Sequence, residues 1–250
     1  MVGLKARLAA GETLLGTFIK TPHPHVVEVL ASTALDCLCI DAEHAPFDRR
    51  DIDQCILAAR SARMPILVRT PSAAPEQILN ALDCGADGVV VPHVRSATEA
   101  QALADCACYG PGGRGYAGSS RAAGYGLATI PDHLAASEAR TTVIAQIEDV
   151  EALDAIDAIA AVDGIDALFI GRIDLTLALG CVSPDDPRVT DAVERIVLAC
   201  VGAGRSVGMF VSRAEEVALW RAKGVRLFLL QSDHAFLRSG AAALRQSAGL

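Results

Sequence analysis

The sequence predicts an α/β protein built as a single (β/α)8 barrel domain over residues 1–250. Three observations support this prediction. Short β-branched or apolar runs alternate with amphipathic stretches rich in Ala, Leu and Arg along the chain. Eight such pairs follow one another, and strict alternation of strands and helices is typical of a parallel sheet. The length of 250 residues also fits, because closed barrels of this kind run to about 250 residues.

The expected strands are short and apolar. They are Thr13–Phe18, Cys37–Ile40, Ile66–Val68, Gly88–Val91, Val143–Ile147, Ala167–Ile170, Ser206–Phe210 and Leu227–Leu230. The expected helices carry apolar residues three or four positions apart. They are His25–Ser32, Arg49–Arg63, Pro75–Cys84, Ser96–Cys108, Val150–Ala160, Asp186–Ala203, Arg213–Lys223 and Phe236–Gln246. An open doubly wound sheet is the alternative. It would need a glycine-rich turn after the first strand, and Ile19–Pro22 does not supply one.

Two segments interrupt the alternation. Tyr109–Gly126 is rich in glycine and carries Arg114 and Arg121. It is too long for a tight connection, so we expect a functional or mobile loop. Gly180–Pro187 is turn-forming and leads into the helix that follows it. Since no linker or change in composition is visible, we expect one domain.

Composition excludes several classes of protein. Hydrophobic residues make up 52% and charged residues 21%, and the formal net charge is −8, so the chain is globular and has no basic stripe for nucleic acid or anionic membranes. No apolar run is long enough to span a bilayer, and Met1–Ala10 shows no secretory signal. The eight cysteines therefore indicate reduced, mostly buried thiols. We expect a cytoplasmic protein.

Polar residues follow five of the expected strands. They are Asp41, Glu43, His44, Arg69, Gln146, Glu148, Arg172, Asp174, Gln231, Ser232, Asp233 and His234. In a barrel the active site lies at the C-terminal ends of the strands, so we expect these side chains to meet at one mouth.

The carboxylates of this set suggest metal chemistry. Glu148 and Asp174 each follow an apolar strand, and carboxylates without cysteine or a histidine cluster suit Mg²⁺ or Mn²⁺. The alternative is that each caps the helix after it. Arg69 comes just past a buried strand, where its planar fork matches a carboxylate or phosphate. A structural ion pair would explain Arg69 equally well.

Two further residues bear on the type of catalysis. His44 is a candidate general base or simply a solvated loop histidine. A Schiff-base aldolase needs a lysine inside the barrel. Among the three lysines, Lys5, Lys20 and Lys223, only Lys20 follows a strand. Covalent amine catalysis is therefore weakly supported.

Eight segments spread over nearly the whole chain match the motifs of one known family. They are LLGTFIK, LCIDAEHAPFD, ILVRTP, DCGADGVVVPHV, GGRGYAGSSRA, VIAQIED, GIDALFIGRIDL and LLQSDHAFL. The combination of IDAEHAP, QIE and FIG-x-x-DL in this order and spacing is specific. By these motifs the chain resembles the HpcH/HpaI aldolase family of class II, metal-dependent pyruvate aldolases.

The resemblance implies a role for each matching residue. Glu148 of QIE and Asp174 of FIGRIDL correspond to the metal ligands. The implied ion is Mg²⁺ or Mn²⁺, with Co²⁺ or Zn²⁺ as alternatives. Arg69 of VRT corresponds to the residue that holds the pyruvate carboxylate and stabilises the enolate. His44 of EHAP corresponds to the catalytic acid/base, with Asp41 as its orienting partner.

Substrate and subunit contacts are implied in the same way. Gln146 corresponds to a residue near the bound keto acid. The stretch expected to contact the substrate comprises Gly171, Arg172, Ile173 and Asp174. Asp83 of DCGAD resembles a catalytic acid that reaches a neighbouring subunit's site. The family exchanges its C-terminal helix between the protomers of trimers or hexamers, which places Phe236–Gln246 in a subunit contact.

The implied activity is carbon–carbon bond cleavage. A 4-hydroxy-2-oxo acid would give pyruvate and an aldehyde, and the reverse aldol addition would also occur. A divalent ion acts as Lewis acid and Arg69 adds positive charge where the enolate oxygen develops, so no lysine is needed. One alternative is enolate chemistry on oxaloacetate, either decarboxylation or a citrate-like condensation. It is favoured if Arg114, Arg121 and Arg172 face the site. The other alternative is a non-catalytic barrel that binds a 2-oxo acid.

Three residues depart from the family pattern. Arg172 stands where the family usually has proline, and it either forms an ion pair or reads an anionic group on the acceptor. Arg121 and His234 also resemble variants of a subgroup. These departures concern the substrate, not the fold or the metal.

Overall fold

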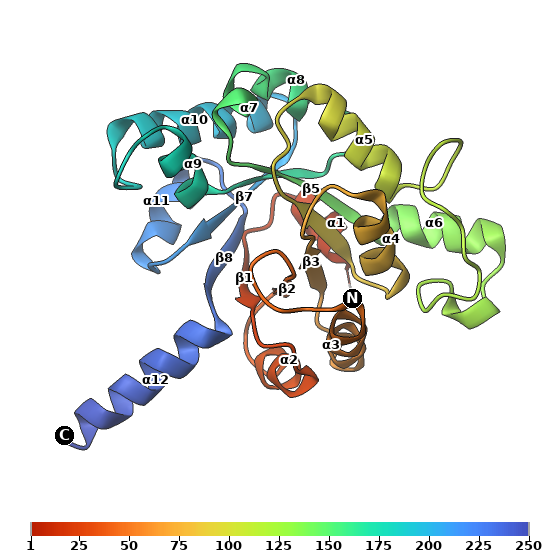
Figure 1. Cartoon of the computed structure of the whole chain (residues 1–250), viewed down its shortest axis with the longest axis horizontal. Coiled ribbons are helices and arrows are strands. Elements are labelled where there is room, and N and C mark those ends of the chain that lie inside the picture. Colours follow the sequence, from red (N-terminus) through yellow and green to blue (C-terminus); the bar gives the residue numbers. More distant parts are fainter. Residues whose placement is uncertain (1, 250) are drawn as a thin grey trace.

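The computed structural model describes residues 2–249 and closes eight parallel strands into a barrel (Figure 1). The strands follow one another around the barrel in chain order, and β1 pairs with β8. They are β1 Leu14–Ile19, β2 Cys37–Asp41, β3 Ile66–Arg69, β4 Gly88–Val91, β5 Thr142–Ile147, β6 Ala167–Ile170, β7 Ser206–Val211 and β8 Leu227–Ser232. The predicted (β/α)8 barrel is confirmed, and the open-sheet alternative is wrong.

The barrel wall separates two hydrophobic cores. Because successive side chains of a strand point to opposite faces, the residues of β2 divide between them. Cys37 and Cys39 join the core inside the barrel, whereas Leu38 and Ile40 pack outward against the helices. All four are fully buried. This two-sided burial is the reason why the strands appear in the sequence as continuous apolar runs.

Helices surround the barrel (Figure 1). Those that match predicted helices are α2 Pro24–Ala31, α3 Arg49–Ser61, α4 Pro75–Asp83, α5 Ala97–Ala107, α7 Val150–Asp154, α8 Ile156–Ala160, α10 Pro187–Gly202, α11 Glu215–Lys223 and α12 Asp233–Ser247. The helix expected over Val150–Ala160 is divided into α7 and α8 at Ala155, which has a non-helical backbone. The last helix begins at Asp233, three residues before the predicted start.

Three helices were not predicted. Helix α1 (Leu4–Ala9) packs Leu4 and Leu8 on the core inside the barrel. Helix α6 (Ile130–Arg140) precedes β5, and the side chain of Thr129 caps its first turn. Helix α9 (Arg172–Ala178) follows β6 directly. Before α6 lies the glycine-rich segment, whose regular structure is a single 3-10 turn over Gly124–Gly126.

The C-terminal helix extends away from the barrel (Figure 1). Asp233 is its one buried residue among those described, and Leu237 and Leu244 are exposed. The predicted exchange of this helix between subunits concerns an assembly that a single chain does not contain, so it stays a prediction. Among residues 2–249, none of the helices has the length and apolar character needed to cross a bilayer.

Candidate active site

A cavity of about 540 Å³ opens at the C-terminal ends of the strands. The predicted site residues that line it are His44, Arg69, Gln146, Gly171, Arg172, Ile173 and Asp174. Phe18 and Phe169 form part of its apolar floor, and Lys20 from the end of β1 also reaches it. The C-terminal ends of the strands thus bring together predicted site residues that lie up to 130 positions apart in the chain, from His44 to Asp174.

Arg69 is fixed on three sides at the end of β3. Its Nη2 and Nε donate to Asp41 Oδ1 at 2.8 and 3.1 Å. Its Nη1 lies 3.2 Å from Glu43 Oε2, and its Cζ lies 4.6 Å from the centre of the Phe18 ring. Since the side chain is buried, this arrangement presents a fixed cation to the cavity.

Asp41 is a fully buried carboxylate with several donors around it. Besides Arg69, Lys20 Nζ lies 2.9 Å from Oδ2, and the backbone N–H of His44 donates to Oδ1 at 3.0 Å. Burial acts to raise the pKa of Asp41, but Arg69, the His44 N–H and Lys20 together hold it below its ordinary value. Asp41 therefore contacts the backbone of His44, and its predicted role in orienting the imidazole stays a prediction. The imidazole of His44 lies on the cavity wall, with Nε2 3.7 Å from Glu43 Oε2.

Glu148 is a buried carboxylate at the end of β5. It accepts hydrogen bonds from the backbone N–H of His93 at 3.0 Å and from Gln146 Nε2. Gly171 leaves the space that this carboxylate occupies, because a Cβ at position 171 would lie 2.6 Å from Glu148 Oε2. The other atom of the Gln146 amide, Oε1, is buried and has no hydrogen-bond partner among the described residues.

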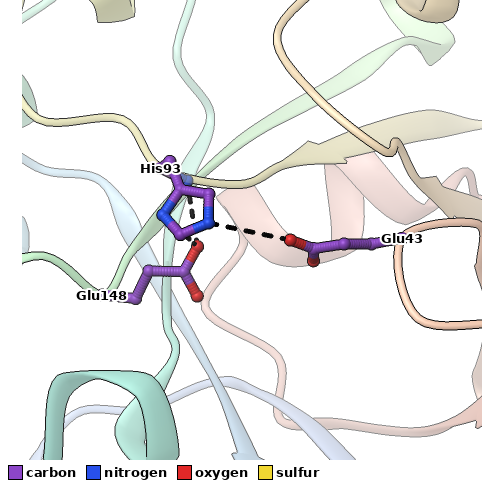
Figure 2. A group of neighbouring side chains, drawn as sticks. All are labelled: Glu43, His93 and Glu148. Atoms are coloured by element: carbon purple, nitrogen blue, oxygen red, sulfur yellow. Dashed lines mark hydrogen bonds and ion pairs between the residues drawn. The ribbon is translucent and has the colours of Figure 1, made fainter. Parts of the chain in front are cut away.

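Glu43, His93 and Glu148 form a tight group of possible metal ligands (Figure 2). One ligand atom from each residue lies within 4.8 Å of the others. Burial raises the pKa of Glu43, with Arg69 acting in the opposite direction. Burial would lower the pKa of His93, but the hydrogen bond to Asp149 and the charges of Glu148, Asp149 and Glu43 raise it above its ordinary value.

His93 was not among the predicted site residues. It comes two residues after β4, so the strand-end rule that identified Asp41 and Glu148 would have identified it as well. The motif GVVVPHV was used only as part of the resemblance. Glu43 was recognised as a strand-end residue, but no role was assigned to it.

Asp174 occupies a different place from Glu148. It lies in the first turn of α9 and lines the cavity, but it is exposed. The group of ligand atoms found among residues 2–249 contains Glu148 and does not contain Asp174. Asp174 therefore lines the cavity, while the closest group of donors around Glu148 comes from Glu43 and His93.

Arg172 is a buried ion-pair residue on the cavity wall. Its side chain is 6% exposed, and Nη2 donates to Glu216 Oε1 at 2.5 Å. Arg213 Nη2 lies 3.3 Å from the same oxygen. The Nε of Arg172 is buried without a hydrogen-bond partner among the described residues. Arg172 thus belongs to an ion pair and also contacts the cavity.

The remaining charged candidates lie away from the cavity within the single chain. Asp83, at the end of α4, pairs with Arg114 Nη2 at 2.5 Å. Arg121 pairs with Asp53 at 2.7 Å. His234 is an exposed residue in the first turn of α12. The predicted reach of Asp83 into a neighbouring subunit concerns the assembly and stays a prediction.

The comparison with known proteins decides the family. The sequence profile of the HpcH/HpaI aldolase/citrate lyase family matches residues 14–238. The chain belongs to this family. A hydroxypyruvate/pyruvate aldolase of Roseovarius nubinhibens is 33% identical over 230 residues, which cover 92% of this chain and 90% of that protein. A 4-hydroxy-2-oxovalerate aldolase of Rhodococcus jostii is 34% identical over 244 residues and covers 96% and 93%.

A solved HpcH/HpaI structure agrees with the fold. The crystal structure of an HpcH/HpaI aldolase/citrate lyase family protein from Burkholderia cenocepacia superimposes with a TM-score of 0.93 at 32% identity. The superposition covers 99% of this chain and 100% of that chain. The family resemblance seen in the motifs is thereby confirmed.

Proposed function

We propose that this HpcH/HpaI protein is a metal-dependent aldolase that cleaves a 4-hydroxy-2-oxo acid to pyruvate and an aldehyde and catalyses the reverse addition. The observation that supports it most directly is a buried cation, Arg69, that lines the cavity and lies 3.2 Å from Glu43, a carboxylate grouped with Glu148. The name of the hydroxypyruvate/pyruvate aldolase supports pyruvate as the 2-oxo acid that cleavage releases and addition consumes, and the name of the 4-hydroxy-2-oxovalerate aldolase supports a 4-hydroxy-2-oxo acid as the compound cleaved.

The residues present fit a divalent cation. Carboxylate and imidazole are ligands for such ions, and Glu43, His93 and Glu148 place three donors within 4.8 Å. Glu148 is buried, and a buried carboxylate needs a compensating charge. By the family resemblance, Glu148 and Asp174 would hold the ion. In the structure, the donors nearest to Glu148 are Glu43 and His93, so Glu148 would be a ligand in either case. A bound cation would withdraw electron density from the keto group of the substrate and make a methyl proton easier to remove.

The protein's own residues supply the remaining chemistry. Arg69 binds the carboxylate of the 2-oxo acid and stabilises the negative charge that develops on its keto oxygen. Asp41 keeps the guanidinium in place for this task. His44, on the cavity wall, moves the proton between substrate and solvent. Gln146 Nε2 donates to Glu148, and Gln146 also lines the cavity in which we place the 2-oxo acid.

The substrate's two ends meet different walls of the cavity. Arg69 ends β3, and Arg172 leans toward Glu216 of α11, which follows β7. In an eight-stranded barrel β3 and β7 lie opposite each other. We assign the 2-oxo acid to the side of Arg69 and the aldehyde to the side of Arg172, Ile173 and Phe210.

Two other functions are less well supported. Enolate chemistry on oxaloacetate is in keeping with the citrate lyase part of the family name. That chemistry is favoured if Arg114, Arg121 and Arg172 all face the site. Of these three, Arg172 lines the cavity, whereas Arg114 and Arg121 pair with Asp83 and Asp53 elsewhere. Schiff-base catalysis by Lys20 is disfavoured, because Lys20 Nζ lies 2.9 Å from the buried Asp41 and this ion pair would have to break before the amine could attack a carbonyl.

Assembly and location complete the proposal. We propose a homo-trimer or homo-hexamer that exchanges α12, which would give Leu237 and Leu244 an apolar partner. The proposed partners are a small 2-oxo acid and an aldehyde, without nucleic acid or membrane. All eight cysteines are free thiols in the structure, which supports the proposed cytoplasmic location.

Deuterium exchange into the methyl group of pyruvate tests the function without knowledge of the aldehyde. The protein is incubated with pyruvate in D2O and the methyl signal is followed by NMR, with Mg²⁺ or Mn²⁺ and again with EDTA. We expect exchange that requires the metal. Absence of exchange with every metal would point to oxaloacetate or to a binding role. Exchange that persists in EDTA would point to Lys20 and would be followed by borohydride trapping.

A further inference from the structure

Lys20 continues the inward face of β1 beyond the end of that strand. Alternate side chains of a strand point to the same face, and Leu14 and Phe18 of β1 belong to the core inside the barrel. Lys20 comes two residues after Phe18 and lines the cavity. Because its side chain is 30% exposed, the ammonium is accessible to a molecule bound there.

Three neighbouring strands present alternating charges at the mouth of the barrel. Phe18 of β1 pairs in register with Cys39 of β2, and two residues after each of them come Lys20 and Asp41. Asp41 pairs in register with Arg69 of β3. Lys20 Nζ lies 2.9 Å from Asp41 Oδ2, and Arg69 Nη2 lies 2.8 Å from Asp41 Oδ1. One carboxylate thus holds two cations, and both of them line the cavity.

Lys20 is fixed at both ends. The backbone N–H groups of Lys20 and Thr21 donate to the buried Asp233 at 2.8 and 2.9 Å, and Asp41 holds the tip of the side chain. Within residues 2–249, Asp41 is the one carboxylate at ion-pair distance from Nζ. An ammonium has three donors, so donors remain for a bound molecule. A cation fixed in this way needs little reorganisation during a reaction.

The proposed reaction develops negative charge on a second oxygen. In the addition, the electron pair of the enolate forms the new carbon–carbon bond, and the π electrons of the aldehyde carbonyl move to the aldehyde oxygen. Arg69 is assigned to the keto oxygen and His44 to the methyl proton, so neither serves the aldehyde oxygen. Since the bond forms at the carbon next to the keto carbon, the aldehyde oxygen comes close to the keto oxygen. A cation beside Arg69 is therefore well placed to stabilise it.

We propose that the Lys20 ammonium donates a hydrogen bond to the aldehyde oxygen and stabilises the alkoxide that forms there. This inference rests on the proposed aldolase function and adds a second catalytic cation to it. The alkoxide then takes a proton from water in the cavity and becomes the 4-hydroxyl group, while Lys20 keeps its charge. Cleavage follows the same path in reverse. No bond to the lysine nitrogen forms, so the ion pair with Asp41 stays intact.

The competing explanation makes Lys20 only a counter-ion of Asp41. Loss of the ammonium would then act through Asp41 on Arg69, which the same carboxylate holds. Enolate formation and addition to the aldehyde would therefore slow together. Under our proposal, enolate formation continues and the bond-forming step is impaired. The ratio of the two rates separates the explanations.

The experiment follows both rates in one sample by NMR. The full chain is incubated in D2O with Mg²⁺, pyruvate and one of three aldehydes, namely acetaldehyde, glycolaldehyde or glyoxylate. Deuteration of the pyruvate methyl group reports enolate formation, and the signal of the 4-hydroxy-2-oxo acid reports addition. The quantity compared between variants is the rate of addition divided by the rate of exchange.

Four variants are compared with the wild-type protein. Lys20→Met removes the charge and keeps the length of the side chain, and Lys20→Gln keeps a neutral donor. Lys20→Arg restores a cation. Lys5→Met is the matched control, because the Lys5 side chain is also 30% exposed and its Nζ lies 3.2 Å from Asp166. Lys5 belongs to α1 and does not line the cavity.

We expect the ratio of addition to exchange to fall about 100-fold in Lys20→Met and at least about tenfold in Lys20→Gln, as is usual when one donor to a developing oxyanion is lost. Lys20→Arg should recover part of the ratio, because it keeps a cation but not the position of the donor. Lys5→Met should have the wild-type ratio. If Lys20→Met does not fold, Lys20→Gln decides.

Three results contradict the assignment, and they differ in what else they affect. Exchange and addition that fall together, at the wild-type ratio, reduce Lys20 to a counter-ion and leave the aldolase proposal intact. Exchange in the wild-type protein without addition to any of the three aldehydes also overturns the role of Lys20, but leaves metal-dependent enolate formation. Absence of exchange in the wild-type protein overturns the proposed function and this inference with it.

Discussion

Asp41 and Arg69 are the last residues of the adjacent strands β2 and β3 and are partners in their register. Their side chains form a buried ion pair, with Arg69 Nη2 2.8 Å from Asp41 Oδ1. The barrel itself therefore sets the direction of the guanidinium. A charged group held in advance at the place where negative charge develops needs little reorganisation during the reaction. This relationship explains why Arg69 is the first residue to test.

Arg69→Ala should slow metal-dependent deuterium exchange of pyruvate by about 100- to 1000-fold, the usual cost of removing one group that stabilises a developing oxyanion. Arg69→Lys should restore only part of the rate, because lysine lacks the planar fork. The rate is measured by NMR at saturating metal. Circular dichroism serves as a control, since the buried Asp41 loses one ionic partner and keeps Lys20. Full activity in Arg69→Ala would refute its assigned role.

Glu148→Ala and Asp174→Ala should each weaken Mn²⁺ binding and abolish metal-dependent exchange. The loss should be larger for Glu148, because it is buried among other donors while Asp174 is exposed. Calorimetric titration of the metal-free protein measures the affinity. Glu194→Ala, on α10 and away from the cavity, is the control. A variant that binds Mn²⁺ as the wild type does shows that its side chain is not a ligand.

Gly171→Ala tests the metal site without removing a charge. The added Cβ would lie 2.6 Å from Glu148 Oε2 and 2.8 Å from Glu148 Cβ, so the carboxylate must move. We expect a weaker affinity for Mn²⁺ together with a loss of stability of about 1–3 kcal/mol, the usual cost of overpacking a buried site. Unchanged affinity would mean that the position of this carboxylate does not determine metal binding.

Arg172→Pro should impair reaction with charged acceptors more than with neutral ones. Position 172 is the first residue of α9, where proline is well tolerated. Arg172 lines the cavity, and its Nε has no hydrogen-bond partner among residues 2–249, so its guanidinium is the group that an anionic acceptor would engage. We expect kcat/KM for glyoxylate to fall about tenfold or more, with a smaller change for acetaldehyde. Equal losses for both aldehydes would restrict Arg172 to its ion pair with Glu216.

The contribution of Glu216 to stability should depend on pH. Burial acts to raise the pKa of Glu216, but Arg172 and Arg213 hold it below the ordinary value of 4.5. A carboxyl whose pKa is lowered by folding stabilises the protein above its unfolded pKa, and this contribution is lost as the pH falls through its folded pKa. Glu216→Gln should lower the free energy of unfolding by about 1–3 kcal/mol at pH 7.

Urea denaturation of the wild-type and Glu216→Gln proteins measures this difference. The two curves should approach each other below about pH 4.5, where the wild-type carboxyl becomes protonated. A difference that stays constant from pH 7 to pH 3 would show that packing, not charge, is responsible.

Strand ends were predictable because parallel strands deliver their C-terminal residues to one place. Asp41, Arg69 and Glu148 each stand at or just after the end of such a strand, so their sequence positions alone predict that they lie close together. His93 follows a strand of four residues and a proline. Its position after a strand would also have predicted a place near the site, but it was not among the predicted site residues. Helix α6 was hidden behind a long glycine-rich segment, which suggested one continuous loop.

Long-range pairing was not predictable from the sequence. Arg172 and Glu216 are 44 positions apart and belong to different helices, and neither has a local pattern that singles out the other. The direction of an arginine side chain depends on which carboxylate the fold brings within reach. The pairing of Arg114 with Asp83 follows the same logic.

Asp233 accepts hydrogen bonds from the backbone N–H groups of Lys20 and Thr21, and Ala235 lines the cavity. The first turn of α12 is therefore anchored to the rim of the barrel, whereas the rest of the helix stands clear of it. In the proposed assembly, where the outer turns of α12 contact another subunit, sequence changes in those turns would alter the subunit contacts without disturbing the cavity. Sequence changes in the first turn would alter the cavity and the direction of the whole helix together, because this turn both lines the cavity and fixes α12 to the barrel.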